Sequence, residues 1–504
     1  WNYPGIDESG WSNAVLAPKP DGSLKAQLCE PIRIIKEYKP VKLEKRSFGR
    51  YWIDAGTNLS GWVRLKINNA KKGDRIIIYY GEHENAMQSG QPGELQQMGY
   101  IAKGGENEVA ECRFSYMGFR YAMIEGYKGQ LSLDDITICE VHSDVEPVGE
   151  FHCSDTTVNR VHDISVKALR FNLHSIPTDC PHREKNGWLG DAVTGMEFGM
   201  ANFDLAALMT KFTRDIFDSQ DNEGRISTIA PDNSYTKGRS TLWSSAAVHI
   251  PWYMYTYYDD TRLFEQYWEK MMLWVESAWK YNNIPEKDGM MKDVLNDWVT
   301  PYDQSHGFKP GGNEAIASMN FYLVLKRMVY MADLLGKMED MKKLEMQKER
   351  IYRGIQKWCF DENKIEYHGL EPFEEFIPVL NILALEYGIV PDKYKDALEK
   401  RVLHNIIEEK NNHLWGGIFA IHAAYEYLPA NGYADVAYQL VVEDTWPSFG
   451  WMTVQGATTI WEGYTDESSN IHHFMGAVDN FFYRYLAGIN FNSDSPGFKE
   501  IIFK

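Results

Sequence analysis

The sequence has little that would indicate a metal centre, a disulfide framework or a membrane span. Its 504 residues include six cysteines, none in a Cys-x-x-Cys pair, so neither a structural zinc site nor a disulfide-rich fold is indicated. No run of about eighteen apolar residues occurs, which argues against a membrane-spanning helix. The common phosphate-loop, nucleophile-elbow and zinc-protease motifs are also missing. We therefore expect no metal and no cofactor.

Basic residues are scarce relative to acidic ones. The chain has 52 Lys and Arg against 71 Asp and Glu, a formal net charge of −19. A surface of this kind repels nucleic acid and anionic membranes, so neither is an expected partner. Aromatic residues, by contrast, make up 14% of the chain, and many stand next to Asp, Glu, Gly or Pro. This pattern favours a polar cleft lined by rings and therefore a carbohydrate partner.

The chain is long enough for two or more domains. Short alternating segments with Gly, Asn and Asp turns, strands at 51–54 and 62–67 among them, predict an antiparallel β-sandwich over residues 31–146. From 147 to 488 a helical period recurs over ten or more segments, 262–282 among them, which predicts one helical domain with alternate loops at one mouth. Residues 1–30 are predicted to be the tail of a preceding β domain or a linker. Residues 489–504 are predicted to begin a further β domain that is cut short.

The segment 179–191 has the composition of a catalytic loop. It contains three carboxylates, an arginine and a tryptophan, and its prolines and glycines leave little room for regular helix. Glycoside hydrolysis needs two acids and benefits from a flat ring that stacks on the sugar. Glu184 can act as general acid if burial, or the charge of Asp179 or Asp191, raises its pKa. The alternative without a function is a salt-bridged loop that caps two helices.

Further candidates stand in loops elsewhere in the helical region. Glu462 follows a tryptophan, which is a weak signal by itself. It is a candidate because glycoside hydrolysis needs a second acid to act with Glu184. His472 and its neighbouring histidine do not predict a metal site, because adjacent side chains do not face one ion and no third ligand is suitably spaced. The remaining candidates are rings and acids suited to binding a sugar: Trp243, Asp297, Trp298 and Trp461.

Taken together, these motifs resemble the bacterial α-L-rhamnosidases, inverting glycosidases built on a six-hairpin helical barrel with β-sandwich attachments. The matching segments are 53–62, Gly118-Phe119-Arg120-Tyr121, 179–192, 456–462 and 483–489. The resemblance implies an antiparallel β-sandwich, then an (α/α)6 barrel, then the start of a C-terminal β domain. It implies release of terminal α-L-rhamnose, with Glu184 as general acid and Glu462 as general base. The sugar-binding residues that it implies are Asp179, Arg183, Trp188, Asp191, Trp243, Asp297, Trp298, Trp461 and His472.

The chain departs from the family pattern in places. One acid next to Arg183 is missing, and Ser245 stands where an aspartate would contact a sugar hydroxyl, which leaves the exact sugar open. Two alternatives also stay open: a non-catalytic carbohydrate-binding paralogue, and a glycosidase of the same fold that acts on another sugar. The resemblance further implies domains before Trp1 and after Lys504. No leader is visible, so bacterial cytoplasm, periplasm and secretion all stay open, as does a homodimer.

Overall fold

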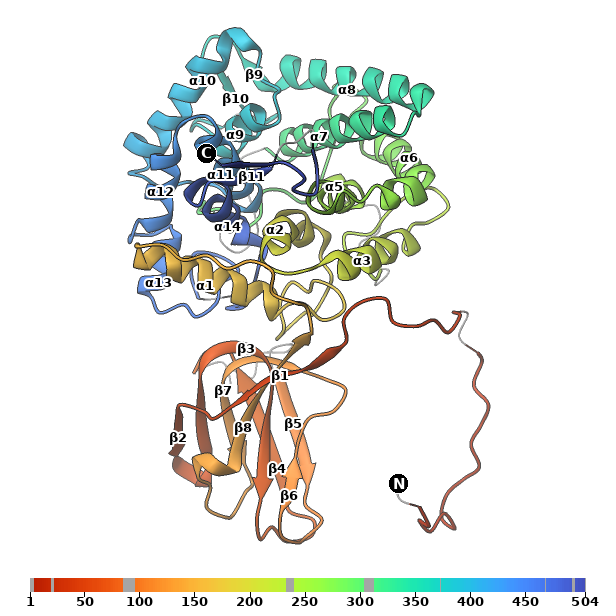
Figure 1. The fold of residues 1–504 in the computed structure, drawn as a ribbon, viewed down its shortest axis with the longest axis vertical. Helices are drawn as coiled ribbons and strands as arrows, with labels where there is room; N and C mark the ends of the chain where they lie inside the picture. The colour runs from red at the N-terminus through yellow and green to blue at the C-terminus, as the bar shows by residue number, and fades with distance from the viewer. Residues whose placement is uncertain are drawn as a thin grey trace.

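The computed structural model describes residues 4–19, 22–84, 96–232, 240–302, 312–371, 373–466, 468–491 and 495–503. A β domain lies below a larger helical domain, and the segment before the first strand runs outside both (Figure 1). The predicted fold class is confirmed, because an antiparallel β domain is followed by a helical domain; where the sequence predicts the start of a C-terminal β domain, the structure has a small pair of strands.

The β domain is a single antiparallel sheet of eight strands, ordered β1-β8-β3-β7-β4-β5, with β2 and β6 also paired to β3. Buried residues alternate with more exposed ones along β4, β5, β6 and the second half of β3, whereas β7 and β8 are buried over most of their length. Ile53, Leu59 and Val63 are fully buried. This alternation is what a sheet with one face on the core requires. The strand bounds are β1 Ile32–Tyr38, β2 Lys42–Lys45, β3 Tyr51–Ile67, β4 Arg75–Gly81, β5 Gln96–Ile101, β6 Glu108–Ala110, β7 Met117–Glu125 and β8 Ile136–Ser143.

Strand β3 joins the two halves of this domain. The sequence predicts separate strands at 51–54 and 62–67, whereas the structure has one continuous strand of 17 residues. Its pairing with β7 shifts register between Asp54 and Leu59, and it meets β8 only from Gly61 onward. Gly61 has φ +150°, and a Cβ there would lie 1.9 Å from the carbonyl oxygen of Cys139. Glycine therefore lets the strand bend and approach β8 without ending.

The helical domain alternates buried and half-buried helices along the chain. In the inner helix α9 every residue is buried except Glu386, which is half-buried, whereas the next helix, α10, buries only Leu398 and Val402. A helix that is apolar all round is covered on all sides, and one with a narrow apolar stripe lies at the surface. The inner helices are α2 Leu189–Asn202, α5 Ala246–Tyr258, α7 Asn313–Leu334, α9 Pro378–Glu386, α11 Ile418–Ala430 and α14 Val478–Phe481. The outer ones are α1 Thr156–Arg170, α3 Ala206–Asp218, α6 Arg262–Asn282, α8 Met338–Cys359, α10 Asp392–His404 and α12 Ala434–Val442.

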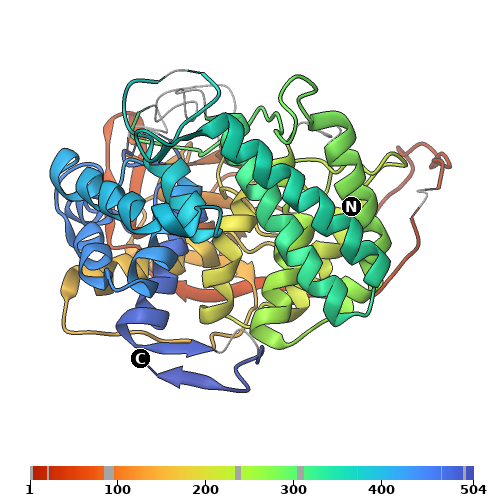
Figure 2. The ribbon, with the colours of Figure 1, turned by 90° about the horizontal axis from the view of Figure 1, so that it is seen from above.

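The inner helices close into a ring. In the order α2, α5, α7, α9, α11 and α14, each inner helix contacts the next, and α14 contacts α2. Each outer helix packs against an inner one, and the layers are visible from above (Figure 2). Short elements complete the domain: α4 Thr241–Ser244, α13 Phe449–Val454, a 3-10 helix η5 Phe474–Ala477, π-helical turns at Asn405–Glu409 and Phe482–Leu486, and a hairpin of β9 Phe360–Asp361 and β10 Glu366–Tyr367.

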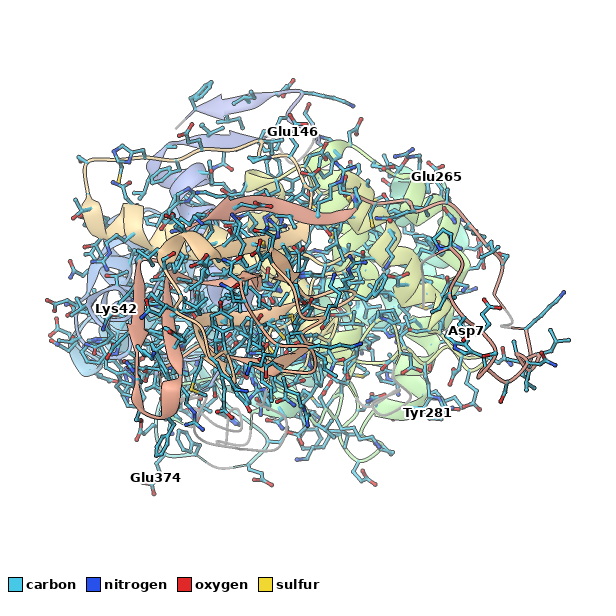
Figure 3. The ribbon with its side chains drawn as sticks, turned by 90° about the horizontal axis from the view of Figure 1, so that it is seen from below. Asp7, Lys42, Glu146, Glu265, Tyr281 and Glu374 are labelled. Carbon is cyan, nitrogen blue, oxygen red and sulfur yellow. The ribbon has the colours of Figure 1, made fainter. Side chains whose placement is uncertain are left out.

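The described chain ends in a small hairpin of β11 Ile489–Phe491 and β12 Ile501–Phe503, which pair antiparallel. Exposed charged side chains such as Lys42 and Glu374 stand near the edge of the molecule (Figure 3). Over the described ranges, no helix combines the length and the apolar character needed to cross a membrane.

Candidate active site

A pocket of about 80 Å³ lies among the loops that precede the inner helices. One buried water needs about 10–15 Å³ by the same measure, so this pocket has room for several water-sized groups, the scale of one sugar ring. Eight of the eleven site residues predicted from the sequence line it, together with Leu295 and Phe474. The eight are Asp179, Glu184, Trp188, Asp191, Trp243, Trp298, Glu462 and His472.

The 179–191 loop is held in place by its own backbone and by the β domain. The backbone N–H of Asp179 donates to the carbonyl of Asn186 at 2.9 Å, and the Asn186 N–H donates to Asp179 Oδ1 at 2.8 Å. These two bonds close the loop on itself. Lys185 takes a left-handed conformation, φ +55°, and its ammonium donates to the carbonyl of Tyr116 in the β domain. The tight turn at 181–184 thereby aims Glu184 at the pocket.

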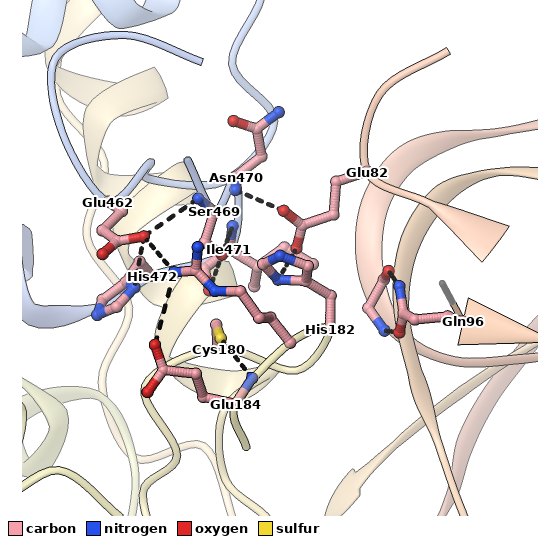
Figure 4. Close-up of polar contacts among 12 residues, drawn as sticks. Glu82, Gln96, Cys180, His182, Glu184, Glu462, Ser469, Asn470, Ile471 and His472 are labelled. Carbon is pink, nitrogen blue, oxygen red and sulfur yellow. Dashed lines mark hydrogen bonds and ion pairs between the residues drawn. The ribbon is translucent and has the colours of Figure 1, made fainter. Parts of the chain in front are cut away.

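Arg183 connects the two candidate acids. Its Nη2 lies 3.0 Å from Glu462 Oε2 and 3.7 Å from Glu184 Oε1 (Figure 4). Arg183 and Glu462 are 279 positions apart, so only the folded barrel brings them together. The indole N–H of Trp188 donates to Glu184 Oε2 at 2.8 Å. Each acid is therefore oriented by a hydrogen bond or ion pair before any ligand arrives.

The surroundings of Glu462 favour its charged form. Burial opposes ionisation, but the charges of His472 and Arg183 and the N–H of Ser469 outweigh it and hold the pKa of Glu462 below its usual value. His472 Nδ1 lies 4.0 Å from Glu462 Oε2, and its Nε2 lies 2.7 Å from Asp191 Oδ1. Burial lowers the pKa of His472, but the hydrogen bond to Asp191 and the nearby carboxylates outweigh burial and raise it to about 9. His472 is thus a cation at neutral pH.

Asp179 lines the pocket, yet only 2% of its surface is exposed. Burial, with the charges of Glu184 and Asp191, raises the pKa of Asp179 to about 7 against the lowering effect of His472. Its Oδ2 accepts a hydrogen bond from the Cys180 thiol at 3.0 Å. A carboxyl group near its pKa at neutral pH can either accept from or donate to a sugar hydroxyl.

The tryptophans that line the pocket depend on close packing and on unusual backbone conformations nearby. A Cβ on Gly190 would lie 2.2 Å from the Trp243 indole, so only glycine lets this ring lie against the start of α2. Val299, next to Trp298, has φ +57°, a strained conformation for a β-branched residue. The surrounding structure holds it there, since the carbonyl of Trp298 accepts the N–H of Ile418 at 3.2 Å.

The structure places some expected site residues elsewhere. Asp297 is fully buried, and its two oxygens accept the backbone N–H groups of Gly417, Phe419 and Ala420. This aspartate caps the start of α11 rather than facing the pocket. Trp461 lines a separate cavity between the two domains. Arg183 stands behind the two acids and is absent from the lining.

Sequence reasoning missed Leu295 and Phe474. The ring of Phe474 lies 3.9 Å from the His472 ring, centroid to centroid. Both residues sit within three positions of a residue that the sequence did select, so proximity was the only available signal. At Ser245, where the family pattern has an aspartate, the side chain is fully buried. Its hydroxyl donates to the carbonyl of Leu242 at 2.6 Å and is thus engaged by the backbone.

Comparisons with known proteins identify both domains. A model of the bacterial alpha-L-rhamnosidase 6 hairpin glycosidase domain matches residues 146–486, and one of the bacterial alpha-L-rhamnosidase concanavalin-like domain matches 44–142. An alpha-L-rhamnosidase of Formosa agariphila is 28% identical over all of this chain and 55% of its own length. Another from Streptomyces avermitilis is 26% identical over all of this chain and 48% of its own. The chain thus spans about half the length of the curated relatives it matches.

Solved structures agree with these matches. The alpha-L-rhamnosidase from Dictyoglumus thermophilum superposes with a TM-score of 0.91 at 35% identity, over all of this chain and 57% of the other. The Streptomyces avermitilis alpha-L-rhamnosidase complexed with L-rhamnose gives a TM-score of 0.84 at 25% identity, over 95% of this chain and 46% of that one.

Proposed function

Because the chain belongs to the bacterial α-L-rhamnosidase family, we propose that it hydrolyses terminal α-L-rhamnosides with inversion of configuration. The observation that carries the proposal is the pair Glu184 and Glu462, held on either side of Arg183 at the rim of a pocket that fits one sugar ring. The related Streptomyces enzyme that was solved with L-rhamnose supports this choice of sugar.

In this mechanism Glu184 is the general acid. It protonates the glycosidic oxygen as the bond from that oxygen to C1 breaks, and the departing group leaves as an alcohol. Glu462 is the general base: it removes a proton from a water molecule, which attacks C1 from the opposite face and yields β-L-rhamnose. The charges of His472 and Arg183 keep Glu462 ionised and so ready to accept that proton.

The two acids are held near each other by their shared contact with Arg183. Inverting enzymes separate their carboxyl groups by about 6.5–9.5 Å, whereas retaining enzymes use about 5–5.5 Å. Both contacts are made by Arg183 Nη2, at 3.0 Å to Glu462 Oε2 and 3.7 Å to Glu184 Oε1, so these two oxygens are at most the sum of these distances apart. This upper limit reaches the inverting range and also includes the retaining one, so the configuration of the released sugar decides between the two mechanisms. The remaining residues, Asp179, Asp191 and the tryptophans, would hold the sugar hydroxyls and the apolar ring face.

Proton NMR during hydrolysis of p-nitrophenyl α-L-rhamnoside tests the mechanism. The first product seen should be β-L-rhamnose, and initial release of the α anomer would refute inversion. Glu184→Gln should lose about 10²–10⁴-fold in rate on a rhamnosyl disaccharide but much less on the aryl glycoside, whose leaving group needs little protonation. An equal loss on both substrates would refute the acid role.

Binding without turnover would instead favour the non-catalytic paralogue. Titration of L-rhamnose against the wild-type chain separates the two cases, because a binding protein retains saturable binding while releasing no sugar from either glycoside.

A further inference from the structure

A buried glutamate of the β domain lies between the two loops that carry the candidate acids. Glu82 directly follows β4, and only 4% of its surface is exposed. Its Oε2 accepts the backbone N–H of Asn470 at 2.6 Å, and its Oε1 lies 3.3 Å from His182 Nδ1. His182 belongs to the 179–191 loop, and Asn470 to the segment that follows Glu462 (Figure 4). One side chain of the β domain therefore contacts both loops.

On the base side, the N–H that Glu82 accepts is next to the backbone groups that hold Glu462. The Glu462 N–H donates to the carbonyl of Ser469 at 2.8 Å, and the Ser469 N–H donates to Glu462 Oε2 at 3.2 Å. The next N–H along the chain is that of Asn470, which donates to Glu82. His83 adds a second contact, since its Nδ1 lies 3.1 Å from Asn470 Nδ2. The position of the Glu462 carboxylate is thus linked to the β domain through two consecutive residues.

On the acid side, His182 lies in the tight turn that ends at Glu184. The Glu184 N–H donates to Cys180 Sγ at 3.5 Å, which closes the turn around His182. Strand β7 packs directly against this turn, because a Cβ on Gly118 would lie 2.8 Å from the backbone nitrogen of His182. Gln96 fixes that part of β7, since its amide accepts the Gly118 N–H at 2.9 Å and donates to the Gly118 carbonyl at 2.7 Å (Figure 4). The position of Glu184 therefore depends on how the β domain contacts the turn.

Glu82 makes these contacts without adding a negative charge to the site. Burial raises the pKa of Glu82 to about 8, although a backbone hydrogen bond and the charges of Arg183 and His472 lower it. This carboxyl group is therefore largely protonated at neutral pH. Burial also lowers the pKa of His182 to about 3, so its imidazole is neutral. A protonated carboxyl group can accept a backbone N–H with one oxygen and donate to a neutral imidazole with the other, and it does not draw Arg183 away from Glu462.

We propose that Glu82 is a positioning residue for the hydrolysis: through its contacts with both loops, it holds the general acid and the general base in their places relative to each other. This inference rests on the proposed function and extends the machinery of the active site into the β domain. Such a contact matters for the rate, because misplacement of a reacting group by about 1 Å can cost about 10²-fold. If Glu82 served only to join the domains, its loss would lower stability and leave catalysis by the folded molecules unchanged.

Two substitutions of Glu82 separate positioning from packing. Glu82→Met keeps most of the volume but neither polar contact, whereas Glu82→Gln can keep both, since its amide oxygen accepts and its amide nitrogen donates. On p-nitrophenyl α-L-rhamnoside and on α-L-rhamnosyl-(1→6)-D-glucose, Glu82→Met should lower kcat about 10–100-fold and change KM by less than about threefold. Glu82→Gln should retain kcat within about threefold on both substrates. The matched control is Glu125→Met, the same change at a residue of β7 that pairs with Arg50, and it should alter neither constant.

A substitution of His182 tests the acid side alone. His182→Phe keeps the shape of the ring and removes its contact with Glu82. It should lower kcat on the disaccharide about tenfold, because cleavage of that bond needs protonation by Glu184, and leave kcat on the aryl glycoside within about threefold. If Glu82→Met does not fold, as thermal unfolding will show, this variant decides: the selective loss supports the proposal, and wild-type kinetics on both substrates refute it.

The possible outcomes separate this proposal from the function on which it rests. A folded Glu82→Met variant with the kcat of the wild type, a loss confined to KM, or a Glu82→Gln variant as impaired as Glu82→Met would overturn the positioning role and leave the rhamnosidase activity standing. If the wild type cleaves neither rhamnoside, the proposed function fails, and amide hydrogen exchange then tests the contacts directly. The N–H groups of Glu184 and Asn470 should exchange about tenfold faster in Glu82→Met than in the wild type or Glu82→Gln, the change expected for one net hydrogen bond, and unchanged exchange would refute the proposal.

Discussion

Removing the charge of His472 should move the pH dependence of catalysis in a defined direction. His472 Nδ1 lies 4.0 Å from Glu462 Oε2. A unit charge at this distance contributes about 4 kcal/mol at an effective dielectric constant of about 20, which equals about three units of pKa. In His472→Gln, Arg183 remains and water screens the site, so we expect the pKa of Glu462 to rise by about one to two units.

The assay is the pH profile of kcat/KM on p-nitrophenyl α-L-rhamnoside, whose acidic limb reports the base of the free enzyme. This limb should shift to higher pH in His472→Gln, whatever happens to the absolute rate. The matched control is His473→Gln, because burial and the charge of His472 lower the pKa of His473 to about 3 and leave it neutral. A folded His472→Gln variant with the acidic limb of the wild type would refute the electrostatic coupling, and with it the role of Glu462 as base.

Three substitutions test how the site is built. Gly190→Ala should raise KM about tenfold, because the new Cβ meets the Trp243 ring at 2.2 Å and must displace it; an unchanged KM would show that the ring position is unimportant. Asp297→Ala should lower the free energy of unfolding in urea by about 2–4 kcal/mol, since three backbone N–H groups lose their acceptor. If Asp297 instead contacts the sugar, KM will rise while stability hardly changes. Arg484→Met should cost about 3–5 kcal/mol in the same assay, because it leaves the buried carboxylate of Glu426 without its cation; a smaller loss would mean that the pair is solvated.

Local patterns in the sequence predicted much of the architecture. The helix expected at 262–282 is α6, Arg262–Asn282, because a long amphipathic period has few other ways to bury its apolar face. The single strand β3 was predicted as two, because glycines that mark turns in most contexts here let one strand bend toward a neighbour far away in the sequence.

In the site, too, local patterns predicted some features, and contacts between distant residues decided the others. The residues of the 179–191 loop lie close together in sequence, so their composition alone pointed to paired acids and a ring. Asp297 looked like a sugar ligand beside Trp298, yet its carboxylate caps α11, whose first residues come more than a hundred positions later. No local pattern shows which distant N–H groups a carboxylate will meet. The separate cavity between the two domains could not be predicted from local patterns either, since its walls come from both domains.

What the sequence by itself determined, then, was which acids and rings are candidates for a site and where the helical and strand periods lie, because both depend on residues that are neighbours in the chain. The tertiary structure decided which acid faces which. Closure of the inner ring brings Glu462 to Arg183 across 279 positions, places the charge of His472 beside it, and turns Asp297 away. Burial and distances through space set each pKa and each ion pair in the site. Neither quantity can be read from the order of residues alone.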